Sequence, residues 1–194
     1  MVTLDHYDSF ASEYFRSTVN ADMGHARKRF MFFLKRGRIL DFGCGSGRDA
    51  KYFLSHGFEV EATDGSETMC RLAAEYTGLQ VRHQLFEELD EENVYDGIWA
   101  CASVLHLDKK SLHDVFLRME RSLREGGIIY CSFKYGDFEG WKDNRFFTCF
   151  TGKGFCVFLR EHPALEICSV WKSSDVRPGR SEEKWLNCIL RKEG

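Results

Sequence analysis

The sequence predicts a three-layer α/β domain built on a seven-stranded, mostly parallel sheet. Three observations lead to this prediction. Short apolar runs alternate with segments of helical periodicity, a glycine-rich turn joins the first run to the first of these helices, and the last two runs are joined without a helix. Alternating strands and helices form right-handed crossovers that cover both faces of a sheet, whereas directly joined strands pair antiparallel. The expected strand order is 3-2-1-4-5-7-6.

Each element has its own signal. Apolar alternation or β-branching predicts strands at 38–42, 58–64, 79–83, 95–102, 128–134, 165–173 and 184–192. Apolar residues spaced three and four apart predict helices at 48–57, 66–76 and 109–127, and a further short helix is expected at 151–161. Ser66 is the expected N-cap of the second of these helices, and glycines close the third. We expect a loop at 135–150, and an aromatic-rich helix within 5–23 that either packs in the core or forms a lid.

Length and composition limit the possibilities. With 194 residues the chain has the size of one domain, so we expect a single domain over 1–194, with a helical lid at 1–30 and a sheet core at 37–194. The net charge of −3 does not supply the positive field that draws proteins to nucleic acid or anionic membranes. No apolar stretch approaches the roughly 20 residues of a membrane span, so no membrane partner is expected.

The eight cysteines do not form a recognisable metal or redox motif. None is paired as C-x-x-C, so the usual zinc and dithiol spacings are absent and no metal is expected. The N-terminus carries acids without an apolar core, unlike a secretory signal. Both observations indicate a cytoplasmic protein with reduced thiols.

A glycine loop at 43–47, Gly-Cys-Gly-Ser-Gly, follows the first strand and opens a helix. Asp64 ends the second strand, 21 residues after Gly43, where an acid can accept hydrogen bonds from both hydroxyls of a ribose. A dinucleotide loop would have glycine at position 48, which is Arg48 here. Loop and acid together indicate a different adenosine-containing cofactor, although Asp64 alone could simply stabilise a helix N-terminus.

The stretch 39–47, Ile-Leu-Asp-Phe-Gly-Cys-Gly-Ser-Gly, resembles motif I of the class I S-adenosylmethionine-dependent methyltransferases. The resemblance covers nearly the whole chain and implies a Rossmann-like fold, S-adenosyl-L-methionine as cofactor and S-adenosyl-L-homocysteine as product. Residues 95–107, 132–140 and 175–187 are similar to a bacterial small-molecule branch often described as tellurite-resistance-like. This implies a small-molecule acceptor and leaves its identity open.

The resemblance also implies which residues bind the cofactor. In the family the strand-end acid, here Asp41, lies near the amino acid portion, and the residues after the third strand border the adenine. The expected cofactor-binding residues are Asp41, Gly43, Cys44, Gly45, Asp64, Gly65, Leu85, Phe86, Ala102 and Ser103. Phe86 could equally belong to the core, and Ser103 could be a helix cap.

Catalytic candidates lie where the fourth and fifth strands end. His106 occupies a position that lines the boundary between cofactor and acceptor in the family, and histidine titrates near neutrality; a packed loop histidine is the simpler interpretation. Tyr135 is the second catalytic candidate, and Lys134 could join it in an acceptor pocket. Arg177 and Arg180 either bind an anionic acceptor or belong to a solvated turn.

Three functions remain open from the sequence. The chain could methylate a small molecule, methylate a protein or RNA, or bind S-adenosylmethionine without catalysis. Many amine methyltransferases carry an N/D-P-P-Y/F loop after the fourth strand, whereas this chain has Cys-Ala-Ser-Val at 101–104, which argues against that chemistry. The absence of a recognition domain and the net charge argue against nucleic acid, and we expect a monomer or homodimer.

Overall fold

The computed structural model describes residues 2–177 and 179–194 of the chain. Met1, at the start of the predicted N-terminal segment, and Pro178, between the two arginines of the last turn, lie outside the described residues. The 7-stranded sheet has the order β3-β2-β1-β4-β5-β9-β8, which is the expected order once the strands of a separate hairpin, β6 and β7, are skipped in the numbering. The predicted fold class is confirmed.

The strands of the sheet are β1 (Arg38–Phe42), β2 (Glu59–Asp64), β3 (Arg82–His83), β4 (Tyr95–Ala100), β5 (Leu123–Lys134), β8 (Leu165–Ser174) and β9 (Lys184–Lys192). The helices are α1 (Val2–Thr18), α2 (Gly24–Phe33), α3 (Arg48–Ser55), α4 (Glu67–Thr77), α5 (Lys109–Ser122) and α6 (Gly152–Phe158). Strands β3, β2, β1, β4 and β5 run parallel, and β9 pairs antiparallel with both β5 and β8. The parallel strands therefore end at one edge of the sheet.

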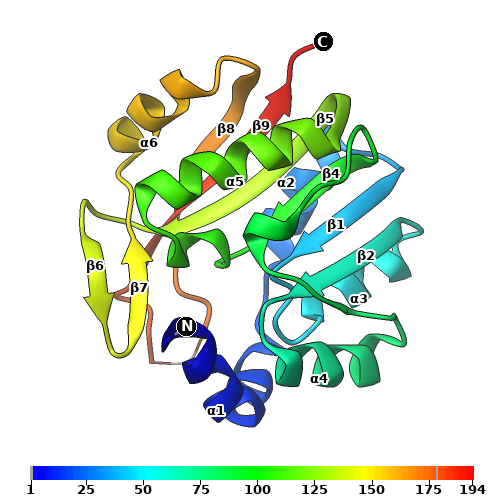
Figure 1. Cartoon of the computed structure of the whole chain (residues 1–194), viewed down its shortest axis with the longest axis vertical. Helices are drawn as coiled ribbons and strands as arrows, with labels where there is room; N and C mark the ends of the chain where they lie inside the picture. The colour runs from blue at the N-terminus through cyan, green and yellow to red at the C-terminus, as the bar shows by residue number, and fades with distance from the viewer. Residues whose placement is uncertain (1, 178) are drawn as a thin grey trace.

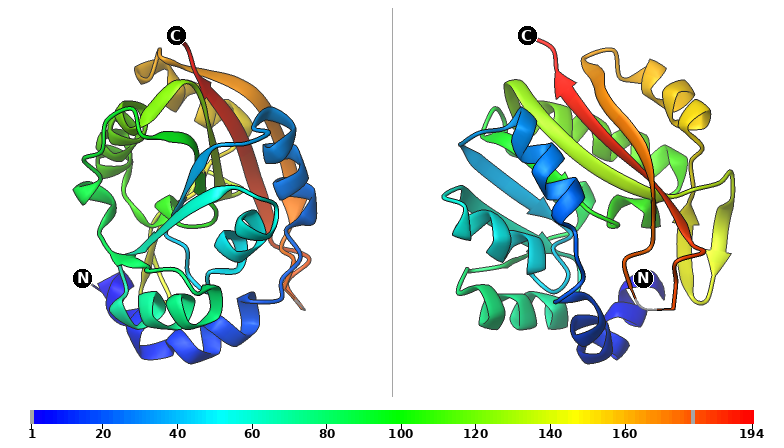
Figure 2. Two further views of the ribbon diagram at one scale, coloured as in Figure 1. Left: turned by 90° about the vertical axis from the view of Figure 1, so that its right-hand side faces the viewer. Right: turned by 180° about the vertical axis from the view of Figure 1, so that it is seen from behind.

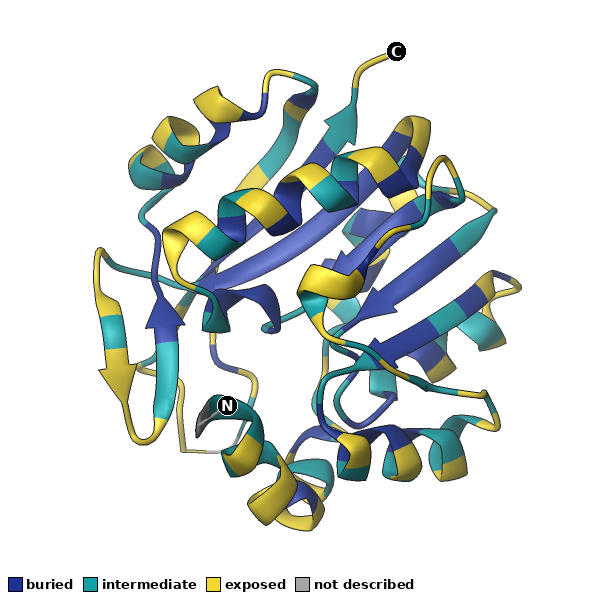
Figure 3. Cartoon of the chain, viewed as in Figure 1, coloured by how far each residue is buried: buried dark blue, intermediate teal, exposed yellow. Residues whose placement is uncertain are grey.

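Helices cover both faces of the sheet (Figures 1 and 2). On one face, α5 and α6 bury side chains such as Phe116 and Phe155 against the strands. On the other, α2 and α3 bury Phe30 and Phe53 against Trp99 of β4. The buried positions concentrate on the central strands and on the inner faces of these helices (Figure 3). These two cores fix the strand ends, on which the loops of the site are mounted.

The predicted helix at 109–127 ends earlier than expected. Helix α5 stops at Ser122, and Leu123 already begins β5. Tyr95 pairs with Leu123 but Gly97 pairs with Ile128, so residues 124–127 bulge out of the strand, with Gly126 at a φ of 72°. The glycines therefore permit a β-bulge rather than a helix C-cap.

The expected loop at 135–150 contains a β-hairpin, β6 (Glu139–Lys142) and β7 (Arg145–Thr148). Asp143 and Asn144 connect the strands with φ values of 50° and 59°. Two consecutive residues with positive φ are typical of a type I′ turn, which favours Asn and Asp. A short polar turn between aromatic strands was the signal that could have predicted this hairpin.

The N-terminal segment divides into two helices with different surroundings. Helix α1 lies across the edge where the parallel strands end, near the hairpin (Figure 1). Helix α2 instead belongs to the helical layer behind the sheet, where Phe30 is fully buried. The lid hypothesis for 1–30 can therefore apply to α1 and not to α2. None of the helices in the described part of the chain has the length and apolarity that a bilayer span requires.

Candidate functional site

The glycine loop turns sharply between β1 and α3 at the strand-end edge. Gly43 has a φ of 78°, and a Cβ there would approach the side chain of Ser103 to 2.5 Å. Gly47 has a φ of 72°, and a Cβ there would lie 2.7 Å from the Thr77 side chain of α4. Glycine is required at both positions by conformation and by close approach. Gly47, the third glycine of the loop, thus allows α3 to begin close against α4. In a dinucleotide-binding loop, a glycine at position 48 would have this packing role.

Asp64, the last residue of β2, holds this loop in place. One carboxylate oxygen accepts a hydrogen bond from the backbone N–H of Gly45 at 2.8 Å, and the other accepts from that of Ser66 at 2.9 Å. Burial raises the pKa of Asp64, and these two hydrogen bonds oppose the rise. Each oxygen has a second lone-pair direction, so the carboxylate can accept two more hydrogen bonds.

A cavity of about 470 Å³ opens between the glycine loop, the loops after β3 and β4, and α1. Eight of the ten residues predicted to bind the cofactor line it: Gly43, Gly45, Asp64, Gly65, Leu85, Phe86, Ala102 and Ser103. Its volume lies within the roughly 300–1,000 Å³ typical of small-molecule sites.

The lining fits an adenosine cofactor. A carboxylate with free lone pairs, Asp64, lies beside a floor of glycines without side chains, and Leu85 and Phe86 supply apolar surface. The N–H of Leu85 already donates to Glu88, so it is not free for a ligand. The Ser103 hydroxyl donates to the backbone oxygen of Phe42 at 2.7 Å, which fastens the loop after β4 to the end of β1.

Two predicted residues, Asp41 of β1 and Cys44 of the glycine loop, lie outside the lining of this cavity. Asp41 is buried, and its Oδ2 atom has no hydrogen-bond partner among the described residues. Burial and the neighbouring Asp49 raise the pKa of Asp41 well above its usual range. Burial likewise raises the pKa of the Cys44 thiol. Neither side chain reaches the cavity wall, so any influence on a bound cofactor would pass through the loop.

His106 lies where the sequence argument expected it, after β4 and at the cavity wall. Its Nδ1 atom is 2.7 Å from the backbone oxygen of Phe146, and its Nε2 atom is 2.8 Å from the hydroxyl of Tyr7. A carbonyl oxygen only accepts, so Nδ1 carries the proton and Nε2 accepts from the Tyr7 hydroxyl. Burial lowers the pKa of His106 to about 4, which keeps the imidazole neutral.

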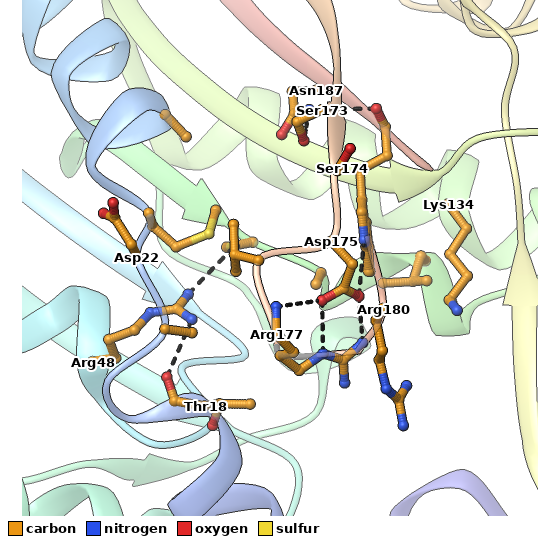
Figure 4. A pocket seen from close by; sticks show the side chains of 18 of the residues that line it. Thr18, Asp22, Arg48, Lys134, Ser173, Ser174, Asp175, Arg177, Arg180 and Asn187 are labelled. Atoms are coloured by element: carbon orange, nitrogen blue, oxygen red, sulfur yellow. Dashed lines mark hydrogen bonds and ion pairs between the residues drawn. The ribbon is translucent and has the colours of Figure 1, made fainter. Parts of the chain in front are cut away.

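A second cavity of about 150 Å³ adjoins the first (Figure 4). It is enclosed by α1, the start of α3, the ends of β4 and β5, the hairpin, and the segment between β8 and β9. Four residues line both cavities: Tyr7, Tyr14, Ala102 and His106. We call these four residues the junction.

The second cavity contains most of the predicted acceptor residues but not Tyr135. Lys134, Arg177 and Arg180 line it. The Tyr135 side chain instead packs against the core, and the Lys172 ammonium lies 3.9 Å from its ring centroid. The structure therefore does not bring Tyr135 to either cavity, because the chain turns away after β5 to enter the hairpin.

Arg177 is less available to bind an anionic acceptor than its position in a polar turn suggested. Its guanidinium makes a two-pronged contact with the buried Asp175, at 3.0 and 2.6 Å. Burial raises the pKa of Asp175, but the hydrogen bonds and charge of Arg177 outweigh it and lower the pKa overall. Trp185 also donates to this carboxylate, at 3.2 Å. The arginine is thus already neutralised, as Figure 4 shows.

Sequence reasoning missed several lining residues. Arg48 was read only as a missing glycine, yet it lines the second cavity and pairs with Asp49 at 2.6 Å. Arg145 lies on the unforeseen hairpin and lines the same cavity. Tyr7 and Tyr14 belong to the aromatic-rich helix expected within 5–23, and their spacing gave no sign that both would line the cavities or that Tyr7 would contact His106.

The comparisons with known proteins agree with this geometry. Residues 39–127 match the family model described as "Methyltransferase domain". The matched segment runs from β1 through the glycine loop to the start of β5, and it includes Asp64 and His106. The match covers 89 of the 194 residues, so the chain is similar to this methyltransferase domain over slightly less than half of its length.

Individual relatives are more distant. The chain is 29% identical over 136 residues to a protein of Geobacillus sp. (strain WCH70) described as a methyltransferase, covering 63% of this chain and 55% of that protein. It is 30% identical over 95 residues to the malonyl-[acyl-carrier protein] O-methyltransferase of Salmonella typhimurium, covering 47% of this chain and 36% of that protein. The chain thus spans about half, or less, of the length of these relatives.

Among solved structures, the chain resembles the 1,6-didemethyltoxoflavin-N1-methyltransferase of Burkholderia thailandensis, crystallised with 1,6-didemethyltoxoflavin and S-adenosylhomocysteine. The TM-score is 0.79 at 23% sequence identity, over 100% of this chain and 88% of that one. At this identity the likeness establishes the shared Rossmann-like methyltransferase fold.

Proposed function

We propose that this chain transfers the methyl group of S-adenosylmethionine to a small-molecule acceptor. The observation that carries the proposal is the junction: a larger cavity with a ribose-type carboxylate and a smaller cavity meet at one wall. A methyl donor and an acceptor have to approach each other in line, which two adjoining cavities make possible.

Cofactor binding is assigned to the larger cavity. Asp64 would hold the ribose hydroxyls, the backbone at Gly43 and Gly45 would lie against the amino acid portion, and Leu85 and Phe86 would flank the adenine. When bound, S-adenosylmethionine supplies a sulfonium-activated methyl group: an electron pair of the acceptor forms the new bond to carbon, and the pair of the broken carbon–sulfur bond stays on sulfur.

The chain itself aligns the acceptor and excludes water. The hydrogen bond from Tyr7 to His106 lies within the junction and joins α1 to the loop after β4. Thr3 of α1 also accepts a hydrogen bond from the N–H of Phe146, at 3.2 Å. We therefore assign α1 the role of a lid, and His106 the role of a positioning residue that holds the lid closed. A water-free site favours methyl transfer because charge is lost as the transition state forms.

A small acceptor is supported by the size of the second cavity, about 150 Å³, and by the likeness to a methyltransferase of a small molecule. The similarity to the tellurite-resistance-like branch supports the same size class and does not identify the substrate. As part of the proposal, the chain works in the cytoplasm as a monomer or homodimer, without a membrane or nucleic acid partner.

The test begins with the cofactor. Thermal melts are recorded with S-adenosylmethionine, S-adenosylhomocysteine and NAD in separate samples. A ligand at about 100 times its dissociation constant stabilises by ~2.7 kcal/mol, which should raise the midpoint by roughly 5–10 °C at this chain length. A shift with the two sulfur nucleotides alone supports the proposal, whereas a shift with NAD alone, or no shift, contradicts it.

Turnover is then followed as S-adenosylhomocysteine released from S-adenosylmethionine in the presence of small acceptors, a protein mixture or RNA. Release that depends on a small acceptor supports the proposal. Release that depends only on protein or RNA would assign the chain to a macromolecular target. Tight cofactor binding without release under any condition would indicate a binding module.

A further inference from the structure

Five arginine and lysine side chains line the second cavity, and four of them are already paired with carboxylates. The pairs are Arg48 with Asp49, Lys134 with Glu183, Arg177 with Asp175 and Arg180 with Glu183. The fifth, Arg145, makes no ion pair with any residue that the structure describes. Its Nε atom is shielded from solvent and has no hydrogen-bond partner in the same part of the chain.

Arg145 lies beside the junction. It begins β7, and its guanidinium carbon is 5.3 Å from the ring centroid of Phe147, which also lines the cavity. Burial raises the pKa of Tyr7, and the charge and hydrogen bonding of Arg145 oppose that rise. Burial lowers the pKa of His106, and the charge of Arg145 lowers it further. The guanidinium therefore acts on both groups that close the junction.

The junction offers no free base. The lone pair of His106 at Nε2 already accepts the hydroxyl of Tyr7. Burial raises the pKa of Tyr14, so its phenol stays protonated. Burial also raises the pKa of the nearby Cys101 thiol to about 12. Asp175 is occupied by Arg177 and Trp185. Among the described residues at the junction, an acceptor that had to lose a proton would find hydrogen-bond donors and no available proton acceptor; Asp22 and His25, the other acid and imidazole that line the second cavity, lie at the start of α2.

The walls also limit the shape of an occupant. Phe147, Trp171 and Trp185 line the second cavity together with the two tyrosines of the junction. A volume of about 150 Å³ matches the size of cavity known to accommodate benzene. A single planar ring with one charged substituent would fill this space and bring its charge to Arg145.

We infer that the methyl acceptor is a small anion with a planar apolar body, that it enters already ionised, and that Arg145 holds its negative charge. The inference rests on the proposed function. An ionised acceptor atom carries no proton, so the new carbon bond forms without proton release and the absence of a free base is no obstacle. Arginine suits this role because its planar guanidinium can grip a carboxylate with two hydrogen bonds.

The experiment compares two probes of equal size that differ in charge, 4-fluorobenzoate and 4-fluorobenzamide. Their binding to the protein saturated with S-adenosylhomocysteine is measured from the ¹⁹F NMR line width. We expect the benzoate to bind at least about tenfold more tightly than the benzamide, since a charge-assisted contact contributes more than a neutral one. Equal affinity for the two probes, or binding of neither, would overturn the inference.

Three variants assign the charge preference to one residue. Arg145→Gln should lose the preference for benzoate, and Arg145→Lys, which keeps the charge, should retain part of it. Arg160→Gln removes an exposed arginine of the turn after α6 and should leave binding unchanged. A preference that survives in Arg145→Gln would overturn the inference.

Calorimetric titration of S-adenosylhomocysteine on the same samples distinguishes a failure of the proposed function from a failure of the inference. A wild-type protein that does not bind S-adenosylhomocysteine refutes the proposed function, and the inference with it. A protein that binds S-adenosylhomocysteine but does not discriminate between the probes refutes the inference alone.

Discussion

Replacing Asp64 with alanine should weaken S-adenosylhomocysteine binding by roughly one to two orders of magnitude. The carboxylate lies in the cavity wall, and each of its oxygens accepts one backbone hydrogen bond and retains one free lone-pair direction. Two ribose hydroxyls can use these directions. A hydrogen bond to a charged group contributes about 1.5 kcal/mol, so losing two costs up to ~3 kcal/mol, or about 100-fold in affinity. Water that replaces part of this interaction reduces the loss towards tenfold.

The same substitution also frees the N–H groups of Gly45 and Ser66, so a loss of affinity could reflect a disturbed loop. Comparing adenosine with 2′-deoxyadenosine resolves this point. In the wild-type protein the missing hydroxyl should weaken binding, and in Asp64→Ala the two nucleosides should bind alike. A disturbed loop would instead weaken both nucleosides and preserve the difference between them.

Isothermal titration calorimetry provides the affinities, and circular dichroism checks that each variant is folded. Glu67→Ala is a matched control, because this acid lies nearby in the first turn of α4, is exposed and does not line the cavity. It should change the affinity less than twofold. The ribose assignment is refuted if folded Asp64→Ala binds S-adenosylhomocysteine within about threefold of the wild-type protein.

Three further predictions concern the lid and its neighbours. Tyr7→Phe leaves the buried Nε2 of His106 without a donor, which should cost about 1–3 kcal/mol and speed limited proteolysis within α1; unchanged proteolysis would contradict the lid role. Ser66→Ala removes both the N-cap contact from Met69 and a hydrogen bond to Asp8 of α1, so it should lower Tm by a few degrees, and by more than Asp8→Ala, which spares the cap. His106 stays neutral in the folded protein because its pKa is about 4, below the unfolded value of 6.5, so the folded state should lose up to roughly 3 kcal/mol of stability as pH falls from 6.5 towards 4. Denaturant titrations should show a shallower pH dependence for His106→Asn, and equal slopes would refute the assignment.

Much of the fold could be predicted because its signals are local. Strand β1 ends where the glycine loop begins, and Ser66 caps α4 by accepting the N–H of Met69, as its sequence position indicated. The end of α5 was mispredicted because the contact that decides it is not local. Two glycines after a helical run resemble a C-cap, and only the pairing of Tyr95 with Leu123 reveals that the strand has already begun. That pairing depends on tertiary structure, which the helical pattern does not contain.

The candidate site likewise has one part that local signals predict and one part that depends on tertiary contacts. The cofactor half follows strand ends, so Gly43, Asp64 and Phe86 could be named in advance. The other half is assembled by contacts that no local pattern encodes. Tyr7 and His106 meet across 99 positions of the chain, and Arg145 reaches the cavity only because the hairpin folds back towards α1.

The cofactor and acceptor parts of the site lie on different parts of the fold, so different segments of the chain should determine acceptor choice. The residues assigned to the cofactor belong to loops fastened to the sheet, as Ser103 is to the end of β1. Of those assigned to the acceptor, Tyr7 lies on α1 and Arg145 and Phe147 lie on the β6–β7 hairpin, both attached outside the 7-stranded sheet, whereas Trp171 and Trp185 belong to β8 and β9. Substitutions at Arg145 can therefore alter the charge of the second cavity without disturbing either core. Acceptor preference should change through these two attachments, while cofactor binding stays tied to the strand ends.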